Sequence, residues 1–132
     1  MTKLKKINHK KLKSFILETL YKAGLDKHSR VSVTTGLYEA SLRGVDSHGV
    51  NLLKHYVYSA LKGRKNPKPK YKLKKTFPAL GVLDANHAFG HAAGMKAIDI
   101  CSKMADKFGI GVIAVKNSSH PGALASMAIK AA

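Results

Sequence analysis

Residues 109–115 read Gly-Ile-Gly-Val-Ile-Ala-Val, and this apolar run decides the fold class. Its length and its β-branched side chains are typical of a buried strand. A helical pattern over residues 90–108 precedes it, and the polar stretch Asn-Ser-Ser-His-Pro-Gly-Ala at residues 117–123 follows it. A polar loop that leaves a strand and enters a helix is a common place for a cofactor phosphate or ring. The pattern predicts an α/β fold with a parallel crossover through the 90–108 helix.

Two further strands are expected before that helix. Residues 71–76 alternate with period two and predict an exposed strand, and residues 79–83 predict a second strand that turns at residues 84–86. A basic loop at residues 63–71 precedes them, and its two prolines favour extended backbone.

The region before this loop predicts three short helices on tight turns. Asn8 caps a helix that ends at Gly24, Asp26 opens a second that stops at Gly44, and Asp46 or Ser47 starts a third that ends at Gly63. We therefore expect an N-terminal helical unit at residues 1–66 and the start of an α/β domain at residues 67–132. The side chains expected to be buried on the four helices are Leu12, Phe15, Ile16, Leu20, Val31, Val33, Leu37, Tyr38, Leu42, Val50, Leu53, Val57, Ala60, Leu61, Met95, Ile98, Cys101, Met104 and Ala105.

Composition restricts the classes of function. The formal net charge of +17 is compatible with a basic nucleic-acid-binding module. The lysines are scattered, however, and the denser groups at residues 3–13 and 62–75 lack interleaved aromatic side chains for base stacking. The single cysteine, Cys101, excludes an internal disulfide and fits a reducing compartment. Without an apolar stretch of about 18 residues or a signal-peptide core, a cytoplasmic protein that binds no membrane is expected.

The strongest chemical signal is Arg-Gly-Val-Asp-Ser-His-Gly-Val at residues 43–50. It places the hydroxyl of Ser47 beside the imidazole of His48, and imidazole can both give and take a proton near neutral pH. The alternative interpretation is an ordinary turn between helices, with Gly44 as a C-cap and an incidental histidine.

These segments, together with Gly-Arg-Lys-Asn-Pro at residues 63–67 and Asp-Ala-Asn-His-Ala-Phe-Gly-His at residues 84–91, resemble the type-2 malate/L-lactate dehydrogenases. This family comprises NAD(P)-dependent oxidoreductases without a Rossmann fold. The resemblance runs in order from about residue 11 to residue 132. It implies NAD or NADP as cofactor, a 2-hydroxy acid, 2-keto acid or cyclic imine as substrate, and a homodimer.

The resemblance also implies roles for individual residues. His48 would be the catalytic acid and base, and Ser47 would orient its ring or relay a proton. Cofactor contact would fall to His120, Pro121, Gly122, Ala123 and Leu124. Backbone N–H groups at a helix start, freed by Gly122, would suit a phosphate or carboxamide oxygen. The alternative is a plain strand–helix turn with Pro121 at the first helical position.

Two further histidines, His87 and His91, have the i, i+4 spacing of metal ligands on one helix face. No carboxylate or third ligand accompanies them, so no metal site is expected.

Two departures from the family pattern affect the expected activity. Leu52 stands where relatives commonly carry an Arg that clamps the substrate carboxylate, so Lys54, His55 or Arg64 must supply the cation, or the substrate differs. The Asp that completes the proton relay in the family would lie beyond Ala132. We therefore expect the N-terminal part of a longer oxidoreductase, incomplete at its C-terminus and inactive by itself. The alternatives are a fragment that keeps the fold without catalysis, or the nucleic-acid-binding module.

Overall fold

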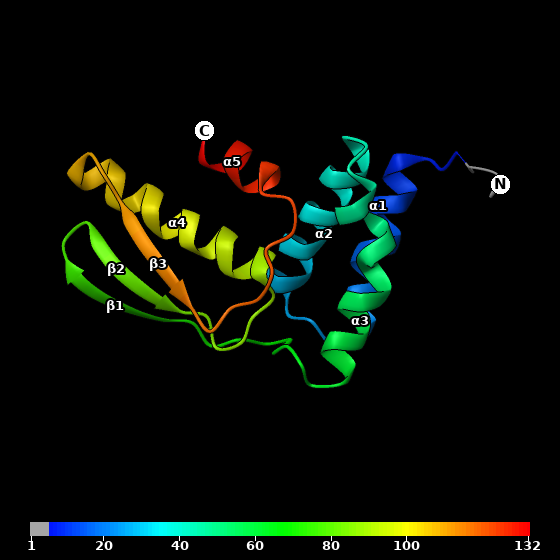
Figure 1. The fold of residues 1–132 in the computed structure, drawn as a ribbon, viewed down its shortest axis with the longest axis horizontal. Helices are drawn as coiled ribbons and strands as arrows, with labels where there is room; N and C mark the ends of the chain where they lie inside the picture. Colours follow the sequence, from blue (N-terminus) through cyan, green and yellow to red (C-terminus); the bar gives the residue numbers. More distant parts are fainter. Residues whose placement is uncertain (1–5) are drawn as a thin grey trace.

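The computed structural model of the chain describes residues 6–132 and combines helices with a small sheet (Figure 1). Residues 1–5, which begin the lysine group at 3–13, lie outside the described residues. The predicted α/β class is confirmed. In chain order the elements are α1 (His9–Lys22), α2 (Lys27–Leu42), the 3-10 turns η1 (Asp46–His48) and η2 (Val50–Leu52), α3 (Leu53–Leu61), β1 (Lys72–Phe77), β2 (Leu80–Asp84), α4 (Gly90–Phe108), β3 (Val112–Lys116) and α5 (Ala125–Ala131).

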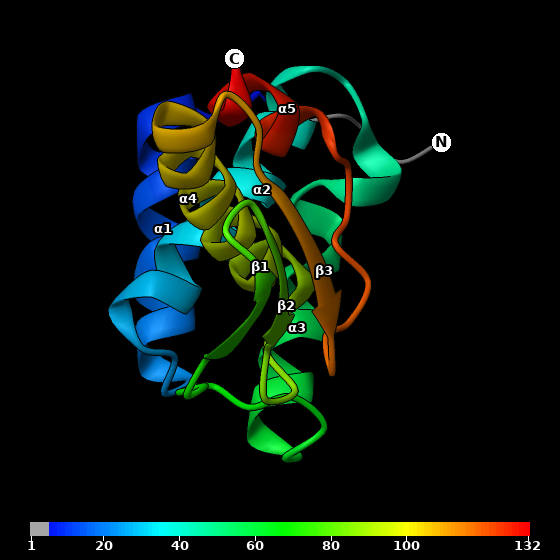
Figure 2. The ribbon, with the colours of Figure 1, turned by 90° about the vertical axis from the view of Figure 1, so that its left-hand side faces the viewer.

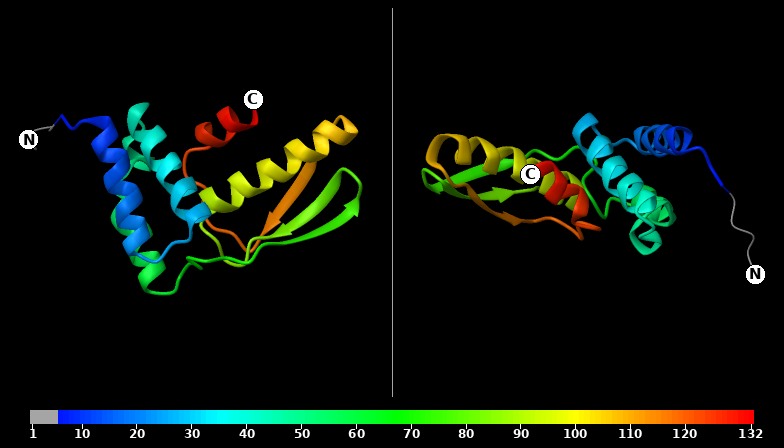
Figure 3. Two further views of the ribbon diagram at one scale, coloured as in Figure 1. Left: turned by 180° about the vertical axis from the view of Figure 1, so that it is seen from behind. Right: turned by 90° about the horizontal axis from the view of Figure 1, so that it is seen from above.

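The first two helices begin where the sequence predicts, because a polar side chain caps each one. Asn8 Oδ1 accepts hydrogen bonds from the backbone N–H groups of Lys10 and Lys11 at 3.0 and 3.1 Å. Asp26 Oδ1 accepts one from the N–H of Ser29 at 2.7 Å. These bonds satisfy N–H groups that have no partner inside the helix. α2 packs against both α1 and α4, and so lies between the N-terminal helices and the part of the molecule that holds the sheet (Figure 3).

The third helix does not begin at Asp46 or Ser47, and that prediction is wrong. Residues 46–52 form two 3-10 turns separated by Gly49, whose backbone is extended, and α3 starts only at Leu53. Gly49 lies so close to Ser41 of α2 that a Cβ there would collide with it. The N–H of Val50 also donates to Ser41 Oγ at 2.9 Å. This anchoring to α2 bends the chain and breaks the helical path directly after His48.

The sheet has the strand order β1-β2-β3. β1 and β2 pair antiparallel, whereas β2 and β3 pair parallel through α4, which confirms the predicted crossover. The ends of α4 also agree with the prediction, since Gly109 follows the helix in the left-handed conformation at φ +77°. α4 covers one face of the sheet (Figure 2). The expectation that β3 is buried is wrong, with Val112 47% exposed, because β3 is an edge strand covered on one face only within the described residues.

The main core joins α1, α2, α3 and the start of α4. Its buried members are Ile16, Leu20, Leu25, Val33, Leu37, Tyr38, Leu53, Tyr56, Ala60, Phe89 and Ala92. Five side chains expected in the core are exposed instead, because the buried stripes are narrower than predicted and each neighbour along a helix is turned by about 100°. Phe15 beside Ile16, Leu61 beside Ala60 and Ala105 beside Met104 show this clearly, and Val31 and Leu42 are the other two. Among the described residues, the helices are too short or too polar to cross a membrane.

Candidate active site

A cavity of about 340 Å³ opens between the η1–α3 segment and the loop that follows β3. Residues from both halves of the chain form it. One wall follows the bend at residues 47–52 and the face of α3, while Phe89 and the 119–120 segment form the other. The lining residues are Ser47, His48, Leu52, His55, Tyr56, Ser59, Lys65, Phe89, Ser119 and His120.

Two histidines that are distant in sequence meet at this cavity. The ring centroids of His48 and His120 are 5.5 Å apart, and the planes are inclined by 49°. Ser47 Oγ lies 2.9 Å from Nδ1 of His48, within hydrogen-bond distance. This bond engages one ring nitrogen and leaves Nε2 as the nitrogen for proton exchange. Both side chains belong to the 3-10 turn η1, which ends at the bend at Gly49.

The loop that carries His120 is held by hydrogen bonds at the carboxyl ends of β2 and β3. Asn117 Nδ2 donates to Asp84 Oδ2 at 3.0 Å. Asp84 Oδ1 also accepts from the N–H of Asn86, and this bond, followed by the one from Asn117, lowers the pKa of the Asp84 carboxyl. Ser119 Oγ accepts from the N–H of Gly90 at 2.9 Å. These contacts anchor the loop to the end of β2 and to the start of α4.

A third histidine, His91, lies in the first turn of α4 and packs against the cavity residue Tyr56. Its ring is fully buried and packs between two glycines, Gly36 of α2 and Gly122 of the loop, where a Cβ at either position would collide with it. Neither ring nitrogen has a hydrogen-bond partner among the described residues. Burial, and then the neighbouring His120 and His48, lower the pKa of His91 to about 4, so this imidazole is neutral at neutral pH.

Aromatic packing links the cavity lining to His91. Tyr56 stacks on Phe89 with ring centroids 5.7 Å apart, and its ring centroid lies 5.5 Å from that of His91. Burial raises the pKa of the Tyr56 hydroxyl to about 12, so this group keeps its proton and can donate a hydrogen bond. The cavity lining therefore combines aromatic surface with imidazoles and hydroxyls, a common composition for small-molecule sites.

Ser47, His48 and His120 from the predicted site all line the cavity. The other predicted residues of the loop do not line it. Pro121, Gly122 and Ala123 are partly buried outside the cavity lining, and Leu124 is 61% exposed. α5 begins only at Ala125, so the alternative that places Pro121 at the first helical position is wrong, and Gly122 does not lie at a helix start either. The proposed role of helix N–H groups freed by Gly122 is therefore not supported. Gly122 instead adopts φ +73° and makes room for His91.

The histidine pair considered as metal ligands does not share a helix face. His87 is exposed and adopts φ +60° in the turn before α4, whereas His91 is buried inside it. Among residues 6–132, no group of three or more His, Cys, Asp and Glu side chains could hold a metal ion.

The sequence interpretation missed several lining residues and the role of His91. The cavity residues Tyr56 and Ser59 follow His48 and Leu52 at helical spacing, a signal available in the sequence. The sequence also carries a signal for the packing of His91. Gly36 stands inside a helical pattern, where glycine commonly marks close packing.

Comparison with known proteins identifies the family. The family model described as malate/L-lactate dehydrogenase matches residues 7–132, nearly the whole chain.

The chain belongs to the malate/L-lactate dehydrogenase family.

Individual relatives agree with this assignment. Malate dehydrogenase of Pyrococcus abyssi is 39% identical over 119 residues, which cover 90% of this chain and 33% of the relative. Ureidoglycolate dehydrogenase (NAD(+)) of Escherichia coli K12 is 30% identical over 127 residues, which cover 96% of this chain and 36% of the relative. The solved malate dehydrogenase of Pyrococcus horikoshii superposes with a TM-score of 0.92 at 33% identity, over 97% of this chain and 37% of that one. This malate/L-lactate dehydrogenase family chain thus spans about a third of the length of the curated relatives it matches.

Proposed function

We propose that this chain carries the proton-transfer residues, and part of the cofactor site, of a dehydrogenase that interconverts 2-hydroxy acids and 2-keto acids or related imines. The observation that supports this most is the meeting of Ser47, His48 and His120 at one cavity. No carboxylate lines that cavity within the described residues, so its charge suits an anionic acid. The names of the malate and ureidoglycolate dehydrogenase relatives support the same class of reaction.

His48 is the proposed acid and base. In the reducing direction its Nε2 proton is delivered to the substrate oxygen or nitrogen as negative charge develops there. In the oxidising direction the neutral imidazole takes the proton from the hydroxyl. Ser47, at 2.9 Å from Nδ1, holds the ring in one orientation throughout. When bound, the nicotinamide supplies or accepts the hydride.

The residues present fit a nicotinamide ring and a small acid. At about 340 Å³ the cavity is near the lower end of the range for small-molecule sites, which is too small for a whole dinucleotide. Tyr56 and Phe89 supply aromatic surface for a flat ring, and His120 would contact the cofactor from the loop. We propose that residues 121–124 continue this contact outside the cavity. NAD is the first cofactor to test, because the related ureidoglycolate dehydrogenase of Escherichia coli is named for its use of NAD(+).

Each of the two proposed units of the chain supplies a different part of the site. Residues 1–66 supply Ser47 and His48, and residues 67–132 supply His120 and its loop. About two thirds of the length of the relatives has no counterpart in these 132 residues. We therefore propose that residues 1–132 bind ligands but do not catalyse hydride transfer by themselves. The homodimer and the cytoplasmic location stay predictions from the resemblance and from the single cysteine.

The test has two stages. First, the 132-residue chain is titrated with NADH and with NADPH, and binding is followed by nicotinamide fluorescence. Second, the chain replaces the matching third of the Pyrococcus horikoshii malate dehydrogenase, and this chimeric enzyme is assayed by nicotinamide absorbance with 2-keto acids and cyclic imines. We expect binding in the first stage and turnover in the second. A folded chimera that binds cofactor but reduces none of these substrates would contradict the proposal, and absence of cofactor binding in both would favour an inactive remnant.

A further inference from the structure

We propose that Lys65 binds the carboxylate of the substrate, taking the place of the Arg that Leu52 replaces. This inference rests on the proposed function and adds a residue that determines specificity for anionic substrates. Lys65 is the one Lys or Arg that lines the cavity among the described residues. Leu52 lines it as well, so the position where an Arg is expected does face the site but offers only an aliphatic surface.

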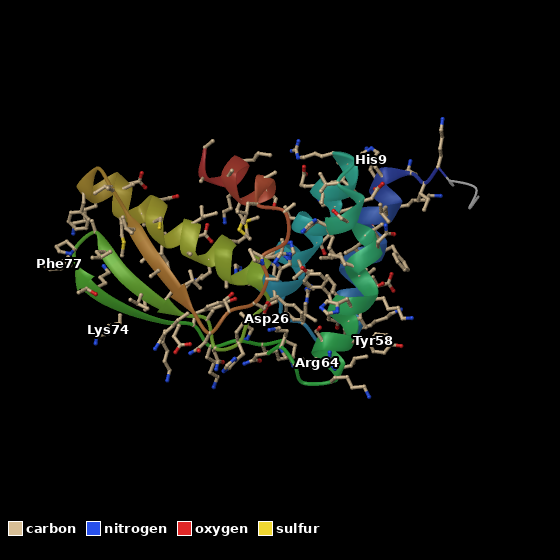
Figure 4. The ribbon with its side chains drawn as sticks, viewed as in Figure 1. His9, Asp26, Tyr58, Arg64, Lys74 and Phe77 are labelled. Atoms are coloured by element: carbon tan, nitrogen blue, oxygen red, sulfur yellow. The ribbon has the colours of Figure 1, made fainter. Side chains whose placement is uncertain are left out.

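The cations that sequence reasoning offered in place of that Arg do not all reach the cavity. Lys54 lies outside its lining and places Nζ 5.7 Å from the ring centroid of Tyr58. The side chain of Tyr58 lies on the side of α3 that faces away from α4 (Figure 4). Arg64, in the turn after α3, is exposed and also outside the lining. His55 does line the cavity, but its ring packs edge-on against Tyr56, with centroids 5.9 Å apart. Lys65 brings a side chain with three N–H donors to the same lining.

The backbone around Lys65 is fixed on both sides. The N–H of Lys65 donates to the carbonyl of Ser59, one of the cavity residues, at 3.1 Å. The N–H of the next residue, Asn66, donates to the carbonyl of His87 at 2.9 Å, and Asn66 Nδ2 donates to Asn86 Oδ1 at 2.8 Å. The base of the lysine side chain is therefore held between α3 and the turn before α4. A cation on a fixed base loses less freedom when it binds an anion.

The charge of Lys65 is available to a ligand. No carboxylate lies within 4.0 Å of its Nζ in the described part of the chain, which holds every Asp and Glu of the sequence. Lys65 is partly buried, so its charge is screened less by water than that of the exposed lysines on β1. With His48 before α3 and Lys65 after it, the two ends of one helix face supply a proton donor and a cation. A 2-keto acid offers the two matching groups, a carbonyl oxygen and a carboxylate.

The test compares two small probes that differ chiefly in charge, oxamate and its neutral diamide, oxamide. Each is titrated into the 132-residue chain, and binding is read from the histidine ring signals in the NMR spectrum, so that no hydride transfer is required. We expect oxamate to bind the unaltered chain more tightly than oxamide. Lys65→Met should weaken oxamate binding by roughly tenfold to a hundredfold, the range for a lost charged hydrogen bond, and leave oxamide binding unchanged. Lys65→Arg should restore most of the oxamate binding, and Arg64→Met, the matched control, should have no effect.

The outcomes separate this inference from the proposed function. In the chimeric enzyme, Lys65→Met should raise KM for 2-keto acids more than it lowers kcat. If oxamate binding depends on Lys65 but no hydride transfer occurs, the inference stands and the proposed function fails. If oxamate does not bind the unaltered chain, or binds Lys65→Met and the unaltered chain equally, Lys65 is not the carboxylate-binding residue.

Discussion

The rings of His48 and His120 lie with their centroids 5.5 Å apart, although one precedes α3 and the other follows β3. His48 lies directly before the bend at Gly49, and His120 lies on the loop that hydrogen bonds hold after β3. Because the two rings come from separately anchored segments, each can be changed by itself, which allows the proton-transfer role of one to be tested against the cofactor role of the other.

His48→Ala should lower turnover of the chimeric enzyme by roughly a hundredfold or more, the low end for loss of a general acid. Cofactor binding should change little, because this imidazole is proposed to act on the substrate. Steady-state kinetics and a fluorescence titration measure the two effects. His87→Ala, which removes an exposed histidine outside the cavity, is the control. A His48→Ala enzyme with full turnover across neutral pH would exclude the assignment.

His120→Ala should affect cofactor binding more than turnover. Because His120 is proposed to contact the cofactor, its removal should raise the Kd for NADH several-fold, the size expected for one hydrogen bond or ring contact. The histidine next to it in space, His48, still supplies the proton, so kcat at saturating cofactor should fall less than in His48→Ala. An unchanged Kd would mean that the loop has only a structural role.

Gly122→Val should affect both stability and cofactor binding more strongly than His120→Ala. The valine must adopt φ +73°, which costs about 1–2 kcal/mol in the left-handed region, and its Cβ would also collide with the His91 ring. Gly24→Val separates the two costs, because Gly24 has φ +88° but nothing within 4 Å of a Cβ. Urea denaturation of both variants measures the difference. Equal destabilisation would show that the loop moves away from His91 without cost.

The stability of the chain should depend on His91 at acid pH. The pKa of its imidazole is about 4 in the folded chain and about 6.5 when unfolded. Below pH 6.5 the unfolded chain binds a proton that the folded chain does not, so the free energy of unfolding falls as the pH drops from 6.5 toward 4, by up to roughly 3 kcal/mol. The full contribution is present above pH 6.5.

His91→Gln removes this titration and should flatten the stability curve between pH 4 and 6.5. Urea denaturation at several pH values gives the curve, and His87→Gln serves as the exposed control. If the His91→Gln curve keeps the slope of the unaltered chain, the acid sensitivity has another source.

Local signals in the sequence predicted the parts of the fold that local chemistry determines. Asn8 and Asp26 cap helices through their own neighbours, and Gly109 ends α4 by its left-handed conformation. The break in the third helix could not be predicted in this way, because it depends on Ser41 of another helix. The exposure of β3 likewise depends on the strand order of the sheet.

The candidate site likewise combines features that follow from neighbouring residues with features that depend on the folded chain. The Ser47–His48 pair is adjacent in sequence, so its hydrogen bond follows from one short motif. Lys65 looks like any other residue of a lysine-rich loop, and only the folded backbone brings it to the cavity. His91 resembled half of a metal-ligand pair, because helical spacing was assumed where the chain makes a left-handed turn at His87.

The crossover from β2 through α4 to β3 also has a kinetic consequence. Parallel pairing of these strands cannot form until the intervening helix has closed back onto the sheet, whereas the α1–α2 hairpin needs only local contacts. Local helical contacts form in microseconds and non-local strand pairing is slower. On dilution from denaturant, helical circular dichroism should therefore recover before the His48–His120 neighbourhood assembles. The ability to bind a ligand would then be the last property that the refolding chain regains.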